Sequence, residues 1–221
     1  MNNQMKLSQK LGVQARDIIS VVGCGGKTSL IKRLAIENAG AGVLICPTTQ
    51  ITTAEMVIHS DITYMGCLKG DKLHAASLEE IHERSHSFPI TLLEADGSKG
   101  LSLKGWASYE PVIPAYTTLT IGVVSVQATG LSANPNNVHR LPLFLEQVGM
   151  KAGGAVDEAA IARMILYCIQ NYGKGRKAIL INQADHDGWY AQAYRIADNL
   201  KGFPGNILIG SLREEQAWRR V

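Results

Sequence analysis

The chain has 221 residues, of which 46% are hydrophobic, 19% charged and 6% aromatic. This is an ordinary globular composition, which excludes a disordered or fibrous chain and supplies enough apolar residues for a sizeable core. The formal net charge is only +3 and the basic residues are scattered, so nucleic acid is not an expected partner.

Membrane association and an oxidising compartment are not indicated either. The first ten residues are polar, and no apolar run approaches the roughly 18 residues that span a bilayer. The four cysteines form no Cys-x-x-Cys pair, which argues against a zinc knuckle or a dense disulfide framework. We therefore expect a cytoplasmic protein with no membrane partner.

Short apolar runs alternate with longer helical patterns along the chain. Strands are predicted at residues 18–22, 43–46, 90–96, 119–126, 178–181 and 207–209. Helices are predicted at residues 27–38, 77–84, 140–148, 156–172, 189–200 and 212–220, the second with Ser77 and Glu80 at capping-box spacing. This alternation predicts a three-layer α/β/α fold with a mainly parallel sheet, similar to P-loop NTPases. Residues 1–221 are expected to form a single domain with insertions at about residues 51–88 and 97–116.

A glycine-rich loop separates the first predicted strand from the first long helix. It consists of Gly23, Cys24, Gly25, Gly26, Lys27, Thr28 and Ser29. Such a loop can turn its N–H groups toward one point and the helix N-terminus adds free donors, so these residues are expected to bind nucleotide phosphates. Lys27 is expected to contact the β- and γ-phosphates, and the Thr28 hydroxyl to bind Mg²⁺. The loop is two residues shorter than the common P-loop pattern, a spacing that resembles the Mur-type peptide ligases.

Two carboxylates end the third predicted strand. Glu94 and Asp96 are two residues apart, which puts them on the same face of a strand and about 7 Å apart. With Thr28, Asp96 is the expected Mg²⁺ ligand, and Glu94 could orient a water molecule or act as a base. Lys27, Glu94 and Asp96 are thus the predicted catalytic residues. The alternative is that Asp96 and Gly97 only form a turn.

A possible base-reading loop follows the predicted strand at residues 178–181. Residues 182–185 read Asn-Gln-Ala-Asp, which resembles the Asn-Lys-x-Asp motif of GTPases. Asn182 and Asp185 would then bind the base, because a carboxylate there accepts two hydrogen bonds that guanine donates and adenine does not. Gln183 stands where that motif has Lys, so GTP and ATP both remain open. An ordinary turn after a strand is the alternative.

Taken together, these stretches resemble the YqeC family. The residues that carry the resemblance are 21–29, 93–99, 103–104, 109–114, 138–140 and 182–185. The resemblance implies a nucleotide-binding accessory protein in the maturation of a selenium-dependent molybdenum hydroxylase. It also implies that hydroxylase, or its maturation proteins, as the partner. The connection to selenium and molybdenum comes from the resemblance alone.

Several further signals have a structural and a functional interpretation. Residues 82–86 match the His-Glu-x-x-His zinc signature, but Pro89 cuts the helix short, which favours a solvated helix end. Cys24 is interpreted as a small side chain in a tight loop rather than a reactive thiol. His139 and Arg140 could contact a phosphate or a partner, or simply begin a helix. In the long loop, Lys104 and Glu110 could form a lid or a partner surface.

The sequence therefore predicts a protein that binds GTP or ATP with Mg²⁺ and hydrolyses it slowly. Phosphoryl transfer of this kind is mostly positioning and electrostatics, so no covalent nucleophile is needed. Two alternatives stay open. One is an ATP-dependent small-molecule ligase or kinase, which the shortened loop suggests; the other is a nucleotide-binding partner module without turnover.

Overall fold

The computed structural model describes residues 5–213 and 218–221. Within them an eight-stranded sheet has the spatial order β13-β12-β11-β9-β1-β7-β2-β4. Its strands are β1 Asp17–Gly23, β2 Val43–Pro47, β4 Ile62–Tyr64, β7 Ile90–Glu94, β9 Leu119–Ser125, β11 Arg176–Asn182, β12 Asn206–Ile209 and β13 Arg219–Arg220. Neighbouring strands are parallel, except that β13 is antiparallel to β12. The predicted mainly parallel sheet is confirmed.

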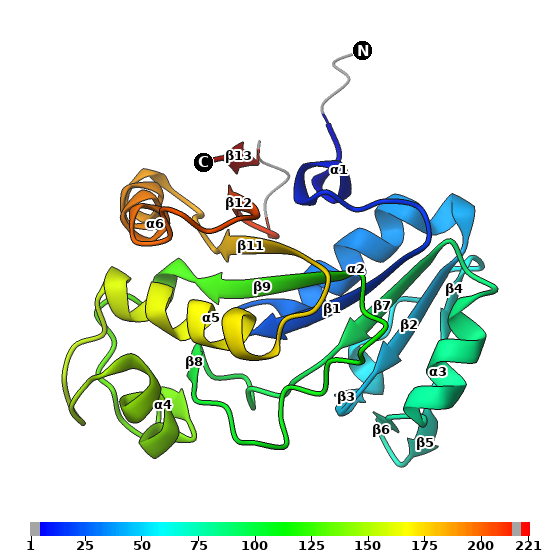
Figure 1. Ribbon diagram of the computed structural model, residues 1–221, viewed down its shortest axis with the longest axis horizontal. Helices are drawn as coiled ribbons and strands as arrows, with labels where there is room; N and C mark the ends of the chain where they lie inside the picture. The colour runs from blue at the N-terminus through cyan, green and yellow to red at the C-terminus, as the bar shows by residue number, and fades with distance from the viewer. Residues whose placement is uncertain (1–4, 214–217) are drawn as a thin grey trace.

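Helices cover both faces of this sheet (Figure 1). Their bounds are α1 Leu7–Leu11, α2 Lys27–Asn38, α3 Leu78–Ser85, α4 Leu141–Val148, α5 Glu158–Tyr172 and α6 Asp187–Asp198. The first two pack on one face, whereas α3, α5 and α6 pack on the other, with α4 outside α5. This confirms the three-layer α/β/α fold. The capping box of α3 also forms, because Ser77 and Glu80 exchange the expected hydrogen bonds.

Two helical layers explain why the inner strands are apolar throughout. All residues of β7 and β9 are buried. Successive side chains of a strand point to opposite faces, so Leu92 enters the core beside α2 and Leu93 the core beside α3. A strand buried on both sides has no polar alternation, and this is why continuous apolar runs predicted these strands correctly.

Two small sheets lie outside the main one. The first is antiparallel and has the order β3 Gln50–Thr52, β6 Lys72–His74 and β5 Cys67–Lys69. The second pairs β8 Leu103–Lys104 with β10 Val138–His139. Short 3₁₀ helices occur at η1 Ala39–Ala41, η2 Thr53–Glu55 and η3 Val126–Ala128. None of these was predicted, because segments of two or three residues show no readable periodicity.

The prediction of a helix at residues 212–220 is wrong for the residues that the structure describes, 212–213 and 218–220. Arg219–Arg220 form strand β13, and the amide of Val221 continues this pairing by donating to the Ile207 carbonyl at 3.1 Å. Trp218 is buried in the core beside α1 and α2, which holds the strand against the sheet edge. Residues 214–217 of the prediction lie outside the described residues. In the described part of the chain, no helix has the length and apolar character needed to cross a membrane.

Candidate functional site

A cavity of about 490 Å³ lies where β1 passes through the glycine-rich loop into α2. Its wall includes the start of α2, the end of β7 at Glu94, Lys99 from the loop after β7, and Gln183 from the loop after β11. Segments far apart in the sequence therefore meet at the carboxyl ends of parallel strands, which is where ligands bind in open α/β sheets.

The glycine-rich loop has a backbone that only glycine adopts readily. Gly25 has φ +84° and Gly26 has φ +125°, and a Cβ on Gly26 would lie 2.4 Å from Nδ2 of Asn182. That amide donates to the Gly25 carbonyl at 2.7 Å, and its oxygen accepts from the Leu212 amide at 3.0 Å. Asn182 thus holds the loop in place, in addition to any role toward a base.

The N-terminus of α2 is uncapped and opens onto this cavity. Gly26 is the N-cap and provides no side-chain hydrogen bond, and the first turn contains no acidic residue. The N–H groups of a first turn have no partner within the helix, so this end carries positive partial charge. Lys27 begins the helix at the same end, with its ammonium group paired with Asp96. The arrangement suits an anion.

Thr28 faces Glu94 across the cavity wall. The Thr28 hydroxyl donates to the Glu94 carboxylate, with distances of 3.0 and 3.2 Å to the two oxygens. Both residues line the cavity. Hydroxyl and carboxylate oxygens are the ligands that Mg²⁺ prefers, so this pair fits a magnesium ion beside bound phosphates.

Asp96, the other predicted acid, lies behind the loop instead of in the cavity. It is fully buried, with an exposed fraction of 0%. Its Oδ2 accepts hydrogen bonds from Nε1 of Trp106 at 2.8 Å and from the Gly23 amide at 3.2 Å. The same oxygen lies 3.1 Å from Nζ of Lys104, and Oδ1 lies 3.3 Å from Nζ of Lys27. Asp96 was expected to bind Mg²⁺ together with Thr28, but its carboxylate is surrounded by protein donors and does not line the cavity.

Lys27 and Asp96 stabilise each other's charged forms. Burial alone would raise the pKa of the Asp96 carboxyl, but the two lysines hold it below its ordinary value of 3.8. Burial would likewise lower the pKa of Lys27, but Asp96 and Glu94 raise it above 10.5. Nζ of Lys27 also donates to the Gly23 carbonyl at 2.8 Å, so it is held at the base of the loop.

The charged cluster continues from Asp96 into the long loop. Nζ of Lys104 lies 3.1 Å from both Asp96 and Glu110 and donates to the Gly97 carbonyl at 2.6 Å. Arg140 forms an ion pair with the other Glu110 oxygen. Lys104 has an exposed fraction of 0% and Glu110 of 6%, so the interpretation of these two side chains as a lid or partner surface is wrong. Their role could not be read from the sequence, since only folding brings these charges together.

His139 and Arg140 come from the short strand β10 and the residue that precedes α4. Arg140 is the N-cap of α4 with φ +57°, and its guanidinium lies over the Tyr109 ring at 5.3 Å. It therefore begins a helix and also joins the charged cluster. The pKa of His139 is below 6.5, because burial and the nearby Arg140, Lys104 and Lys99 disfavour its charged form.

The possible base-reading loop packs on β9 and η3. Asp185 accepts from the Gln127 amide at 2.9 Å through one oxygen, while the other oxygen is buried with no partner among the described residues. Gln183 has φ +67° and contacts the Ser125 hydroxyl through its side chain. Gln183 lines the cavity, but Asp185 does not. A buried carboxylate oxygen without a donor is costly, so a ligand N–H would be a favourable partner for Asp185, but the residue lies outside the cavity wall.

Two other sequence signals have structural roles. His82 stacks on Tyr116 with ring centroids 4.3 Å apart, and a ring nitrogen of His86 lies 2.9 Å from the His82 carbonyl oxygen. In the described part of the chain, no three His, Cys, Asp or Glu side chains are placed so that they could hold a metal ion together. Cys24 is buried in the core, which raises the pKa of its thiol to about 12. Its side chain is therefore no reactive thiolate, although its backbone is part of the loop.

Fold and site together define an α/β/α protein with a mainly parallel sheet and an anion-suited, glycine-rich loop at the carboxyl end of its first strand. The chain matches the family model described as YqeC protein over residues 19–142. It therefore belongs to the YqeC family, as the resemblance indicated. It is 29% identical over 202 residues to "Uncharacterized protein YqeC" of Escherichia coli (strain K12), with 78% of each chain covered. The matched segment includes the glycine-rich loop and the charged cluster up to Arg140, whereas Asp185 lies beyond it.

Replacing Lys104 tests whether the cluster supports the fold. Lys104→Met keeps the apolar stem but leaves two buried carboxylates without their shared cation, so the free energy of unfolding should fall by about 3 kcal/mol or more. The control is Lys201→Met, which removes an exposed ion pair to Asp198 and should change stability by less than about 1 kcal/mol. Urea unfolding measures both variants. Equal, small losses would contradict the role of Lys104.

Proposed function

We propose that the cavity binds the phosphates of a purine nucleoside triphosphate with Mg²⁺. The observation that carries this proposal is the uncapped N-terminus of α2, which faces the cavity together with Lys27 and the Thr28–Glu94 pair. Backbone N–H groups, a lysine, a hydroxyl and a carboxylate are the groups that a nucleotide-binding loop uses.

Different residues of the glycine-rich loop would have different roles in phosphate binding. The amides of Gly23 and Cys24 are used inside the protein, by Asp96 and the Val123 carbonyl, so phosphate contacts come from Gly25 onward. Nζ of Lys27 would turn from Asp96 toward the β- and γ-phosphates. One oxygen of Asp96 then keeps its contacts with Trp106, Gly23 and Lys104, while the other oxygen loses its contact with Lys27.

The metal would be held by Thr28 and Glu94, which replaces the predicted pair of Thr28 and Asp96. Mg²⁺ neutralises charge on the phosphate oxygens when it is bound. Glu94 supports this arrangement from the end of β7, and its contact with the Thr28 hydroxyl already aligns both oxygen ligands. Asp96 would position Lys27 without touching the nucleotide. Slow hydrolysis to the diphosphate is the simplest reaction of such a site.

The physiological setting follows from the family resemblance. We propose that the nucleotide state controls contact with a molybdenum hydroxylase or its maturation proteins. This part of the proposal rests on the resemblance, while nucleotide binding rests on the site.

A ligase or kinase is the second candidate function. It is favoured by a second cavity of about 510 Å³ that shares part of its wall with the first. Turnover that requires an added carboxylic or hydroxylated compound would distinguish this candidate from a regulatory NTPase. A binding module without turnover would show tight nucleotide binding and no hydrolysis at all.

Lys27 is the most direct test of phosphate binding. At one hundred times Kd a bound nucleotide should stabilise the native protein by about 2.7 kcal/mol, and Lys27→Ala should abolish this. Lys32→Ala, on the same helix and outside the cavity wall, is the control. Because Lys27 also neutralises Asp96, Thr28→Val serves as a second variant that should remove the Mg²⁺-dependent part. Full stabilisation in both variants would contradict the phosphate site.

Glu94 tests turnover and the metal assignment together. Glu94→Gln keeps the shape of the side chain but removes its charge, so Mg²⁺-dependent hydrolysis should fall about tenfold or more. The measurement is phosphate release at varied Mg²⁺ concentration. An unchanged rate and an unchanged Mg²⁺ requirement would remove Glu94 from the site.

Asp185 tests the choice of base. If its unpaired oxygen accepts guanine N–H groups, Asp185→Ala should change the ratio of GTP to ATP affinity by about tenfold or more. Competition between the two nucleotides for one fluorescent analogue measures the ratio. Equal ratios in the wild type and the variant would leave base selection to other residues.

A further inference from the structure

The second cavity lies directly beside the proposed nucleotide site. Its volume is about 510 Å³, enough for a small organic molecule. The two cavities share the wall formed by residues 50–52, Gly97 and Lys99. A ligand in the second cavity would therefore contact the same loop segments as a nucleotide in the first.

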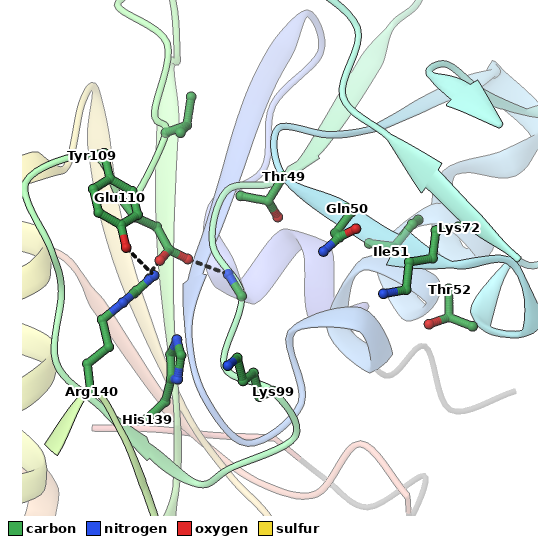
Figure 2. A pocket seen from close by; sticks show the side chains of 12 residues that line it. Thr49, Gln50, Ile51, Thr52, Lys72, Lys99, Tyr109, Glu110, His139 and Arg140 are labelled. Atoms are coloured by element: carbon green, nitrogen blue, oxygen red, sulfur yellow. Dashed lines mark hydrogen bonds and ion pairs between the residues drawn. The ribbon is translucent and has the colours of Figure 1, made fainter. Parts of the chain in front are cut away.

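Three of the four residues with charged side chains in the wall of the second cavity, Lys72, Lys99 and Arg140, are cations. Lys72 enters from β6, on the side opposite Lys99, His139 and Arg140 (Figure 2). Among the residues that the structure describes, neither Lys72 nor Lys99 forms an ion pair with a carboxylate. Arg140 is paired with Glu110, the one acidic side chain of this wall, and Glu110 also accepts from Lys104 and the Gly97 amide. Two positive charges are thus left for a ligand.

The pKa of His139 is also affected by the cations around this cavity. Burial, and after it the cations Arg140, Lys104 and Lys99, lower the pKa of His139, which favours the neutral form of its ring. A neutral imidazole can donate one hydrogen bond and accept another. The Thr49 hydroxyl adds a buried oxygen that has no partner within the described part of the chain. Both groups can hydrogen-bond to an anionic ligand.

Three of the four non-glycine residues with positive φ in the described part of the chain line the two cavities, and the fourth, Arg16, does not. Lys99 at φ +52°, Arg140 at φ +57° and Gln183 at φ +67° are non-glycine residues in the left-handed region, and each lines one or both cavities. Such conformations are uncommon and cost free energy, and they occur preferentially at binding sites. Ile51, Val112 and the Tyr109 ring give the wall an apolar part, beside the polar side chains of Gln50 and Thr52.

We propose that the second cavity binds a small organic anion, a carboxylate or phosphate ester with an apolar body, at the same time as the nucleotide. Lys72, Lys99 and His139 hold the anionic group, and Ile51 and the Tyr109 ring contact the apolar body. The identity of the neighbouring ligand rests on the proposed nucleotide site, whereas the anion site itself can be measured without nucleotide.

Ligand-detected NMR with defined probes tests this proposal. Benzoate and phenyl phosphate should bind both alone and with saturating ADP and Mg²⁺. Inorganic phosphate, which lacks an apolar body, and benzylamine, which is a cation, should each bind about tenfold more weakly or not at all. Equal binding of benzylamine, or no binding of either aromatic anion, would overturn the proposal.

A matched pair of lysine variants locates the site. Lys72→Met should weaken benzoate binding about tenfold, because it removes one of the two unpaired cations. Lys69→Met replaces the lysine that pairs with Lys72 across β5 and β6 but does not line the cavity, so benzoate affinity should stay as in the wild type. Equal effects of the two substitutions would overturn the assignment.

Nucleotide binding in the same samples separates the two proposals. If ADP binds and displaces benzoate completely, the two cavities form one nucleotide site and the anion site is wrong. If non-hydrolysable ATP and GTP analogues with Mg²⁺ do not bind at all while benzoate still binds and depends on Lys72, the anion site stands and the proposed nucleotide function fails.

Discussion

A buried carboxylate with cations from two parts of the chain is the constraint on which the site depends. Asp96 is buried from solvent and would destabilise the fold by several kcal/mol if its charge had no partner. Its charge is compensated by Lys27, at the start of α2, and by Lys104, in the short strand β8. The glycine-rich loop and the irregular segment after β7 are thereby tied to one point behind the cavity.

The same cluster connects the two cavities. It begins with Lys27 at the first cavity, passes through Asp96 and Lys104, and ends with Glu110 and Arg140 at the second. Positive and negative groups alternate along this path. If a phosphate draws Lys27 away, Lys104 is the remaining cation beside Asp96. Lys104 would then interact less strongly with Glu110. If both proposed ligands bind, such a path would offer one physical route for coupling between them.

The features that sequence reasoning identified are local ones. The glycine-rich loop, the inner strands and the capping box of α3 each depend on neighbouring residues, and the structure confirms the strands and the cap. Asp96 illustrates where this reasoning stops. Period-two alternation placed it beside Glu94, but β7 ends at Glu94, so alternation no longer describes the next two residues. Burial of Lys104 and its contacts with Asp96 and Glu110 depend on the path of the long loop, which no local pattern reports. The short strand β13 is likewise formed by pairing with a distant edge.

An NMR titration of backbone amides with non-hydrolysable GTP and ATP analogues and Mg²⁺ tests the central claim most directly. The account predicts that the largest shifts occur at Gly25, Gly26, Lys27 and Thr28, where the uncapped helix N-terminus opens onto the cavity. It also predicts a smaller shift at Nε1–H of Trp106, because that group donates to Asp96 and senses the release of Lys27. Shifts confined to other parts of the chain, or none at saturating nucleotide, would contradict the account.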